Sequence, residues 1–93
     1  MKTLYAFETE AVLLGALANP IRLQVLVFLL EGEWSVMDLA NKIGVNQPAL
    51  SRHLQQLREL KIVNTRRDAN FIFYSCDHPL VRAVLRVLNV VAE

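Results

Sequence analysis

Gly44 separates two short amphipathic segments, and this arrangement limits the folds open to the 93-residue chain more than any other feature of its sequence. Before the glycine, apolar residues recur at helical spacing at Val36, Leu39, Ala40 and Ile43. After it, a second apolar stripe follows at Leu50, Leu54 and Leu57. Because glycine commonly ends a helix, residues 35–60 predict two helices joined by a tight turn.

Both predicted helices have recognisable starts. Ser35, with Asp38 three residues later, resembles a capping box. Asn46 is a favoured N-cap, and Pro48 suits a first helical turn, where the missing N–H of proline costs nothing. Two helices joined in this way, with polar side chains outside the second, form the helix-turn-helix arrangement that reads the major groove of DNA.

The residues before this pair predict two more helices. Residues 4–18 are nearly all apolar, which favours a helix buried on more than one side. Asn19 and Pro20 then end it and start another, because asparagine caps helices well and proline fits the first turn. This second helix is expected to run to about Leu30.

Directly after the two predicted helices, the apolar residues no longer recur at helical spacing. Residues 62–75 are rich in β-branched and aromatic residues on both sides of Asp68-Ala69-Asn70, which predicts a β-hairpin. Residues 78–92 predict a last helix with an unusually wide apolar arc. The predicted fold is mainly α with a β-hairpin: one winged helix-turn-helix domain over residues 1–93, with five helices and a two-stranded wing.

Positive charge is concentrated in the middle third of the chain. Residues 41–67 carry six Lys and Arg against one glutamate, a net charge of +5, whereas residues 1–40 sum to −3 and residues 68–93 to −1. A local basic segment in a chain of net charge +1 indicates an anionic partner such as a phosphate backbone. A solvated charged face would show the same distribution of charge.

The candidate DNA-binding residues are polar or basic side chains of the second helix of the pair and of the hairpin. Arginine donates two hydrogen bonds to guanine and glutamine pairs with adenine, while arginines beside a hairpin tip contact phosphates or the minor groove. The predicted set is Gln47, Ser51, Arg52, His53, Gln55, Arg58, Arg66, Arg67 and Asn70.

Four stretches of the chain resemble the ArsR/SmtB family of transcriptional regulators, and the resemblance covers essentially the whole sequence. They are Asn19-Pro20-Ile21-Arg22-Leu23, Asp38-Leu39-Ala40, Gln47-Pro48-Ala49-Leu50-Ser51-Arg52-His53-Leu54 and Arg66-Arg67-Asp68-Ala69. The resemblance implies a homodimeric repressor that binds an imperfect inverted repeat in double-stranded DNA. Pro48 and Arg52 depart from it, because family members commonly have serine and glutamine there.

The resemblance also implies a dimer formed through the first and last helices, residues 4–18 and 78–92. This agrees with the wide apolar arc of the last helix, which one domain cannot easily cover, and with a hydrophobic content of 54 %. The expected interface residues are Leu4, Phe7, Leu14, Leu80, Val84, Leu85, Leu88 and Val91.

The ligand sets of the family's metal sensors are missing, so we expect no metal and no cofactor. Ser35 and Met37 occupy the positions of one cysteine pair. At the zinc site of other members, Asp77 and Glu93 keep their spacing, but Pro79 and Val90 stand where histidines are needed. His78 is expected to start the last helix rather than to bind metal.

A further subgroup senses sulfur species or oxidants through paired cysteines. Val27 replaces one member of that pair here, and Cys76 is the only cysteine of the chain. Cys76 is therefore expected to be a buried apolar residue, with a thiol-responsive regulator as the competing hypothesis.

The sequence alone leaves the roles of two residues and one competing function open. A winged-helix module that binds protein competes with the DNA-binding regulator, whereas an enzyme is not expected, because no nucleophile, base and oxyanion group converge. His53 is equally compatible with DNA contact and with packing, and Arg22 with a phosphate contact or an acidic neighbour. The chain is expected in the cytoplasm, away from membranes, and its effector is not identified.

Overall fold

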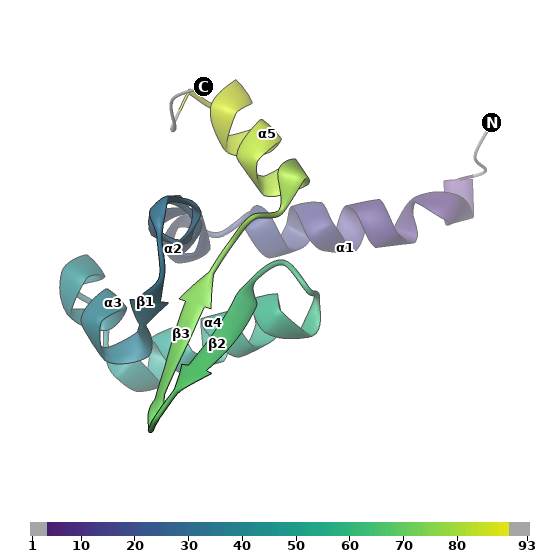
Figure 1. The fold of residues 1–93 in the computed structure, drawn as a ribbon. Helices are drawn as coiled ribbons and strands as arrows, with labels where there is room; N and C mark the ends of the chain where they lie inside the picture. Colours follow the sequence, from purple (N-terminus) through teal and green to yellow (C-terminus); the bar gives the residue numbers. More distant parts are fainter. Residues whose placement is uncertain (1–3, 90–93) are drawn as a thin grey trace.

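The computed structural model describes residues 4–89, and the side chains of residues 6–89. A 3₁₀ turn and α1 come first, at Leu4–Phe7 and Glu8–Leu17, followed by α2 at Pro20–Glu31. The central elements are β1 at Trp34–Ser35, α3 at Val36–Ile43 and α4 at Gln47–Glu59. The chain continues with β2 at Asn64–Asp68, β3 at Phe71–Ser75 and α5 at Pro79–Val87 (Figure 1). The predicted winged helix-turn-helix with five α-helices is confirmed for this part of the chain.

The helices begin at the predicted capping residues. The Asn19 Oδ1 atom accepts hydrogen bonds from the backbone N–H groups of the second and third residues of α2, and Ser35 Oγ accepts one from Asp38 N at 3.2 Å. Asn46 Oδ1 accepts from Ala49 N at 2.8 Å. Gly44 ends α3 in the left-handed region at φ 86°, where residues with a Cβ are strained. The turn between α3 and α4 is therefore specified locally by the sequence.

The sheet contains the expected two-stranded wing and a third strand, β1, which was not predicted from the sequence. The strand order is β1-β3-β2, and β1 pairs antiparallel with β3 through Trp34↔Tyr74 and Ser35↔Phe73. Strand β1 spans only two residues, too short to show an alternating pattern in sequence. The hairpin of β2 and β3, which we call the wing, turns at Ala69 with φ 54° and protrudes from the body (Figure 1).

The two outer helices differ from their predicted bounds. The first begins as a 3₁₀ turn and becomes α-helical only at Glu8. The last helix, expected over 78–92, ends at Val87, and Asn89 adopts a positive φ of 66°. Its start is as predicted, since His78 Nδ1 accepts a hydrogen bond from Leu80 N at 3.2 Å.

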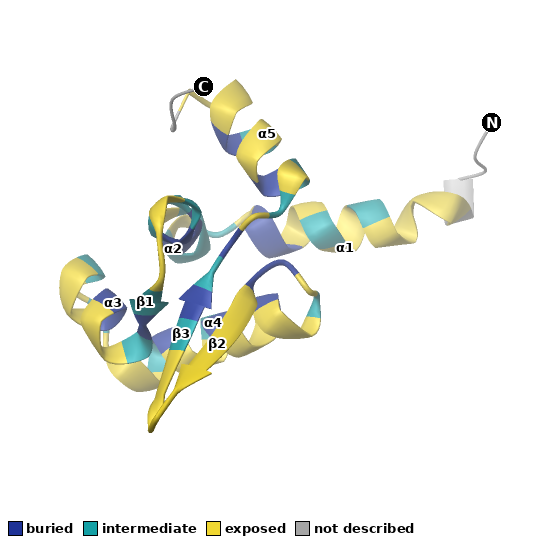
Figure 2. Cartoon of the chain, viewed as in Figure 1, coloured by how far each residue is buried: buried dark blue, intermediate teal, exposed yellow. Residues whose placement is uncertain are grey.

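The core lies between α2, α3, α4, β3 and α5 (Figure 2). Its fully buried side chains include Leu26, Leu39, Leu54 and Leu85. Leu85 was expected in a dimer interface, but it is 0 % exposed in the single chain, because α5 turns this residue inward. Tyr74 is buried on β3, and Trp34 packs edge-on against Phe28 with ring centroids 5.4 Å apart.

A second set of apolar side chains is not covered by the chain itself. Helix α1 extends away from the body and buries only its last two residues, Ala16 and Leu17 (Figures 1 and 2). We give the name apolar face to seven exposed or half-buried apolar residues from the segment through α1 and from α5 with its C-cap. They are Phe7, Val12, Leu14, Leu80, Val84, Val87 and Leu88.

The apolar face contains most of the expected interface residues that the structure describes, namely Phe7, Leu14, Leu80, Val84 and Leu88. Val12 and Val87 belong to it as well, although neither was in the expected set. The side chain of Leu4 and the whole of Val91 lie outside the described residues. In the described part, no single helix has the length and apolar composition to cross a membrane; only α1 and α2 taken together do, and these meet at an angle of 89°.

Candidate nucleic-acid interface

The outer side of α4 carries the exposed polar residues that the sequence predicted. Leu50, Leu54 and Leu57 anchor the opposite side in the core. We call the exposed set the reading face, and its members are Gln47, Ser51, Arg52 and Gln55. The Arg52 side chain makes no hydrogen bond or ion pair with any residue that the structure describes, whereas Gln55 Nε2 donates to Glu59 Oε1 at 3.4 Å. The reading face therefore presents an available guanidinium group to the solvent.

His53 and Arg22, whose roles were open, contact each other. Arg22 Nε donates to His53 Nδ1 at 3.0 Å, its Nη2 donates to Gln56 Oε1, and its Nη1 donates to the carbonyl of Ala16 at 3.4 Å. Within the described residues, Arg22 thus pairs with no acidic neighbour. It joins the start of α2 to the end of α1 and to the flank of α4. Burial, then the charges of Arg22 and Arg52, lower the pKa of His53 below its ordinary value, which keeps Nδ1 available as an acceptor.

This contact between α2 and α4 was not found by sequence reasoning. Arg22 and His53 lie 31 residues apart, and Arg22 and Gln56 lie 34 apart. No local pattern links such positions, because only the packing of α2 against α4 brings them together. The half-buried His53 is directed toward α2 by this contact.

Arg67 and Arg58 lie together where the wing meets α4. With Thr65 and Ile72 they line an open hollow, and all four residues are exposed. Arg67 is on the exposed strand β2 and Arg58 is in the last turn of α4. The hollow thus holds two cationic groups from different elements, the kind of surface that attracts a phosphate.

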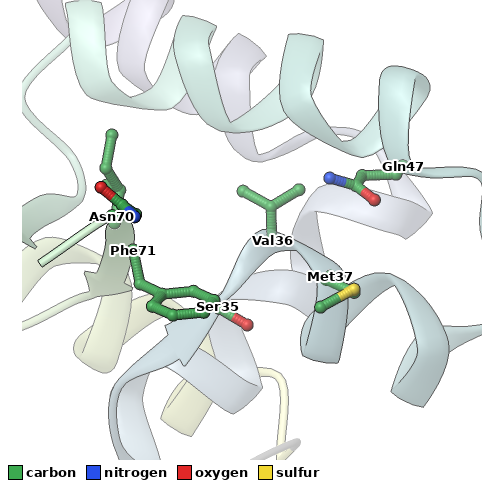
Figure 3. A pocket seen from close by; sticks show the side chains of 7 residues that line it. Ser35, Val36, Met37, Gln47, Asn70 and Phe71 are labelled. Atoms are coloured by element: carbon green, nitrogen blue, oxygen red, sulfur yellow. The ribbon is translucent and has the colours of Figure 1, made fainter.

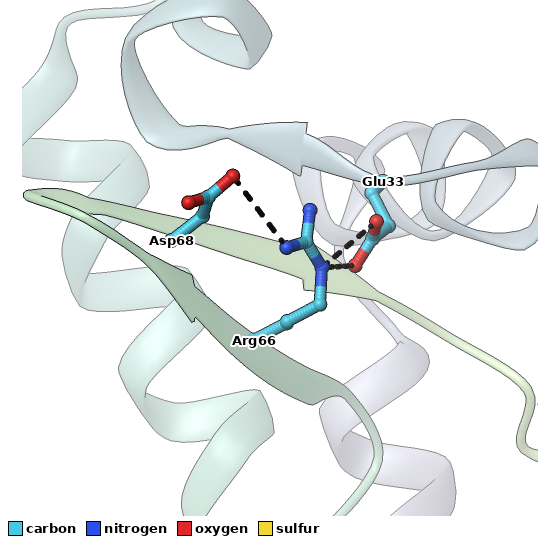
Figure 4. A network of polar contacts seen from close by, with 3 residues as sticks. All are labelled: Glu33, Arg66 and Asp68. Atoms are coloured by element: carbon cyan, nitrogen blue, oxygen red, sulfur yellow. Dashed lines mark hydrogen bonds and ion pairs between the residues drawn. The ribbon is translucent and has the colours of Figure 1, made fainter.

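Arg66 has partners within the chain, although the sequence predicted it beside Arg67 as a DNA contact. Its Nε donates to both carboxylate oxygens of Glu33, at 2.8 and 3.1 Å (Figure 4). Its guanidinium carbon lies 5.0 Å from the centre of the Phe73 ring, and Nη1 is 3.9 Å from Asp68 Oδ2. The hydrogen bond from Arg66 lowers the pKa of the Glu33 carboxyl, and the same bond raises the pKa of Arg66.

A second hollow lies between the start of α3, the start of α4 and the tip of the wing (Figure 3). Gln47 and Asn70, both predicted DNA contacts, stand on opposite sides of it, with Val36 between them in the view. The other lining residues are Ser35, Met37, Phe71 and Ile72. The first residue of α4 and the turn of the wing are thereby placed on one surface.

Cys76 is buried at the end of β3. Its Sγ donates to the carbonyl of Ile62 at 3.3 Å, and its backbone N–H donates to the carbonyl of Leu29 at 2.9 Å. Burial raises the pKa of the Cys76 thiol, so that the reactive thiolate is disfavoured near neutral pH. Among the described residues, no three His, Cys, Asp or Glu side chains are grouped so that they could hold a metal ion.

We expect Cys76 to react slowly with a thiol reagent in the folded protein. At pH 7.5, labelling by 5,5′-dithiobis(2-nitrobenzoate) should be at least roughly a hundredfold slower in buffer than in urea, since modification requires local opening. Because the pKa of the folded thiol is raised, the native rate should start to climb only at a higher pH than the rate of the unfolded chain. Equal rates in both states would instead support a sensor thiol.

The helix-turn-helix segment matches a known family. The family model described as "bacterial regulatory protein, arsR family" matches residues 19–65, which cover α2, α3, α4 and the first two residues of β2. The chain belongs to the ArsR family. As an ArsR-family chain it is a DNA-binding transcription regulator, which agrees with the reading face and the arginines of the wing.

One protein of known name and two solved structures are similar to this ArsR-family chain over most of its length. The transcriptional activator HlyU of Vibrio cholerae is 44 % identical over 78 residues, which cover 84 % of this chain and 72 % of HlyU. The crystal structure of NolR from Sinorhizobium fredii superposes with a TM-score of 0.88 at 42 % identity, covering 96 % of this chain and 94 % of that one. A winged helix-turn-helix DNA-binding domain from Mycobacterium bovis, described as homodimeric, superposes with a TM-score of 0.80 at 30 % identity, covering 92 % and 80 %.

Proposed function

We propose that the chain forms a homodimer that binds an imperfect inverted repeat and represses transcription. The observation that carries the proposal is the position of two surfaces. The wing and α4, which carries the reading face, lie toward one end of the molecule, and α1 and α5, which carry the apolar face, lie farther from the wing tip (Figure 1). Two copies joined through the apolar face would present two reading faces, which a two-fold repeat with centres roughly 34 Å apart would match.

The proposed DNA contacts fall into two groups, contacts to base edges and contacts to phosphates. Gln47, Ser51, Arg52 and Gln55 read base edges, because they are exposed on the helix that enters the major groove. Arg58 and Arg67 contact phosphates, and Asn70 at the turn of the wing assists them. We leave out His53 and Arg66, which the sequence had placed in this set, because both side chains hold contacts within the chain.

Repression requires fewer contacts from this chain than activation does. A dimer that occupies a promoter excludes polymerase by its presence alone, whereas an activator needs an additional favourable contact with polymerase. HlyU is named an activator, so a promoter-fused reporter measured with and without the protein decides the sign for this chain. We propose no reaction for the chain, and we place it with its DNA target in the bacterial cytoplasm.

We expect Arg52→Ala and Arg67→Ala to weaken DNA binding in different ways. The probe is a duplex selected from a random pool by the wild-type protein, with a scrambled duplex for comparison. Arg52→Ala should lose about 1–3 kcal/mol on the selected duplex and little on the scrambled one, since it removes a base contact. Arg67→Ala should weaken both and reduce the slope of log K against log salt by about one for each chain bound.

Arg82→Ala is the matched control, because it removes an exposed arginine from α5, outside the proposed DNA surface. It should leave affinity and salt slope close to those of the wild type. A wild-type protein that shows no preference for any selected duplex would contradict the proposal. So would an Arg52→Ala variant that binds the selected duplex as tightly as the Arg82→Ala control.

A further inference from the structure

Arg66 and Arg67 are neighbours in sequence but lie on opposite faces of the wing. Side chains alternate along a strand, and the register pairs Arg67 with Ile72 and Arg66 with Phe73. Arg67 and Ile72 share the hollow that also holds Arg58 of α4. Arg66 stacks over Phe73 on the other face of the sheet. Only Arg67 therefore lies on the face that the wing shares with α4, the helix that carries the reading face and that we call the recognition helix.

The charges around Arg66 do not favour a phosphate. Glu33 is 2.8 Å from the guanidinium and Asp68 is 3.9 Å from it (Figure 4). Two carboxylates around one guanidinium leave this cluster with a net charge of −1. Arg67, by contrast, shares its hollow with a second arginine and no carboxylate. A DNA strand that approaches the wing meets a repulsive cluster on one face and an attractive one on the other.

The contact between Arg66 and Glu33 spans the sheet. Ser35, Phe73 and Arg66 lie in one row across β1, β3 and β2, and Glu33 is two residues before Ser35, on the same face. The guanidinium thus crosses the middle strand over the Phe73 ring and reaches the segment between α2 and β1. Strand β2 is exposed along its whole length, so no buried side chain of this strand holds it against the body.

Isolated surface ion pairs contribute little to stability. The side chains of Arg66 and Glu33 are 52 % and 42 % exposed, but this pair differs from an isolated one because the guanidinium has a partner on three sides. The Glu33 carboxylate accepts hydrogen bonds from Nε through both of its oxygens. The Phe73 ring lies beneath the guanidinium, and Asp68 faces its Nη1 atom. A planar guanidinium suits such a site and a lysine ammonium does not, since an ammonium has no flat face to stack on the Phe73 ring and no second nitrogen to face Asp68.

We propose that Arg66 is a positioning residue that fixes the orientation of the wing through Glu33, while Arg67 makes the phosphate contact. This inference rests on the proposed use of the wing in DNA binding. It predicts opposite roles for two adjacent arginines, and it assigns a part in DNA binding to an acidic residue that itself touches no DNA.

The decisive variant is Glu33→Ala, because the two roles of Arg66 predict opposite signs. If Glu33 holds the wing in place, its removal weakens binding to the selected duplex, by about threefold or more for a coupled contact. If Arg66 binds phosphate directly, removing the competing carboxylate tightens binding. Glu31→Ala is the matched control, since it removes an exposed carboxylate two residues away and so measures the general effect of one charge. Tighter binding by Glu33→Ala than by Glu31→Ala overturns the proposal.

A second test uses Arg66→Ala and a double variant in which the charges of Glu33 and Arg66 are exchanged. Arg66→Ala should weaken binding but keep the wild-type salt slope, whereas Arg67→Ala lowers it by about one for each chain bound. Arg66→Glu should weaken binding strongly, and Glu33→Arg combined with Arg66→Glu should recover part of the loss, because the swap restores the ion pair with its charges reversed but not the stacking on Phe73 or the contact with Asp68. A salt slope lowered as much by Arg66→Ala as by Arg67→Ala, or a swap no better than Arg66→Glu, overturns the proposal.

A measurement without DNA separates this inference from the proposed function. In the free protein, the Arg66 Nε–H proton should exchange with water more slowly than that of Arg67, and Glu33→Ala should remove the difference. Equal exchange in the wild type means that the contact does not hold the side chain, and the inference fails. Slow exchange at Arg66 in a protein that binds no duplex would mean that the proposed function fails, while the contact itself stands.

Discussion

Leu14→Asp is expected to convert the protein to a monomer and to abolish tight DNA binding. Leu14 lies in α1 and is 53 % exposed, so the described chain leaves about half of this apolar residue uncovered. In the proposed dimer it lies in an apolar interface, where an unpaired charge costs about 3 kcal/mol or more. Two-fold symmetry places this cost in both copies, so the dimer dissociation constant should rise at least about ten-thousandfold.

DNA binding should fall with the dimer. A dimer holds its second reading face at a high effective concentration near the second half of the repeat, and this advantage is worth about 10² to 10⁴ in affinity. The Leu14→Asp variant should therefore bind the selected duplex no more tightly than it binds a duplex that contains a single half-site. Light scattering after size-exclusion chromatography gives the oligomeric state, and a titration of labelled duplex gives the affinity.

Met37→Asp is the control for oligomeric state. Met37 is 51 % exposed, close to the value for Leu14, but it lies in α3 beside the hollow near the wing and outside the apolar face. It should remain a dimer at concentrations where Leu14→Asp is monomeric. If Leu14→Asp and Met37→Asp dissociate equally, or neither does, the apolar face is not the interface.

Local chemistry explains why the helix-turn-helix was predictable from sequence. Ser35 and Asn46 carry their own capping oxygens, and Gly44 adopts the positive φ that its missing Cβ allows. Each of these signals acts within three or four residues. The apolar spacing of α4 places its three leucines inward, which leaves Gln47, Ser51 and Arg52 outward without further information.

The features that sequence reasoning missed depend on contacts between distant segments. Strand β1 exists because Trp34 and Ser35 pair with β3, about forty residues later in the chain, and not because of its own composition. Arg66 was predicted as a DNA contact from its charge and its place in the hairpin, but Glu33 and Phe73 determine where its side chain lies. Leu85 was assigned to the interface because the apolar arc of α5 is wide, and the arc alone does not show which side faces the core.

The comparison of Arg22 with Arg52 shows the same limit for the DNA-binding surface. Both are arginines near helices of the helix-turn-helix, and charge alone does not separate them. Packing gives Arg22 three partners on two other elements, whereas the structure describes none for Arg52. Residue type therefore predicts which groups can bind DNA, and tertiary contacts decide which of them are available.

Leu54→Ala is expected to destabilise the protein by about 2–5 kcal/mol, the usual range for a leucine truncated in a packed core. Leu54 is 0 % exposed and lies in the middle of the inner stripe of α4. Its side chain joins the recognition helix to the core, so the cavity left by truncation lies directly beneath the reading face. Because the free energy of unfolding of a small domain is only about 5–15 kcal/mol, this loss is a large share of the total stability.

Urea denaturation followed by circular dichroism measures the loss, at one fixed protein concentration because dimer formation adds to the apparent stability. Gln55→Ala is the matched control, since Gln55 is the next residue of the same helix and is exposed, and its free energy of unfolding should stay within about 0.5 kcal/mol of the wild type. Equal stabilities for Leu54→Ala and Gln55→Ala would mean that α4 is not seated on this core. The same pair separates fold from recognition, because Gln55→Ala should lose base preference while keeping stability, and Leu54→Ala should lose stability first.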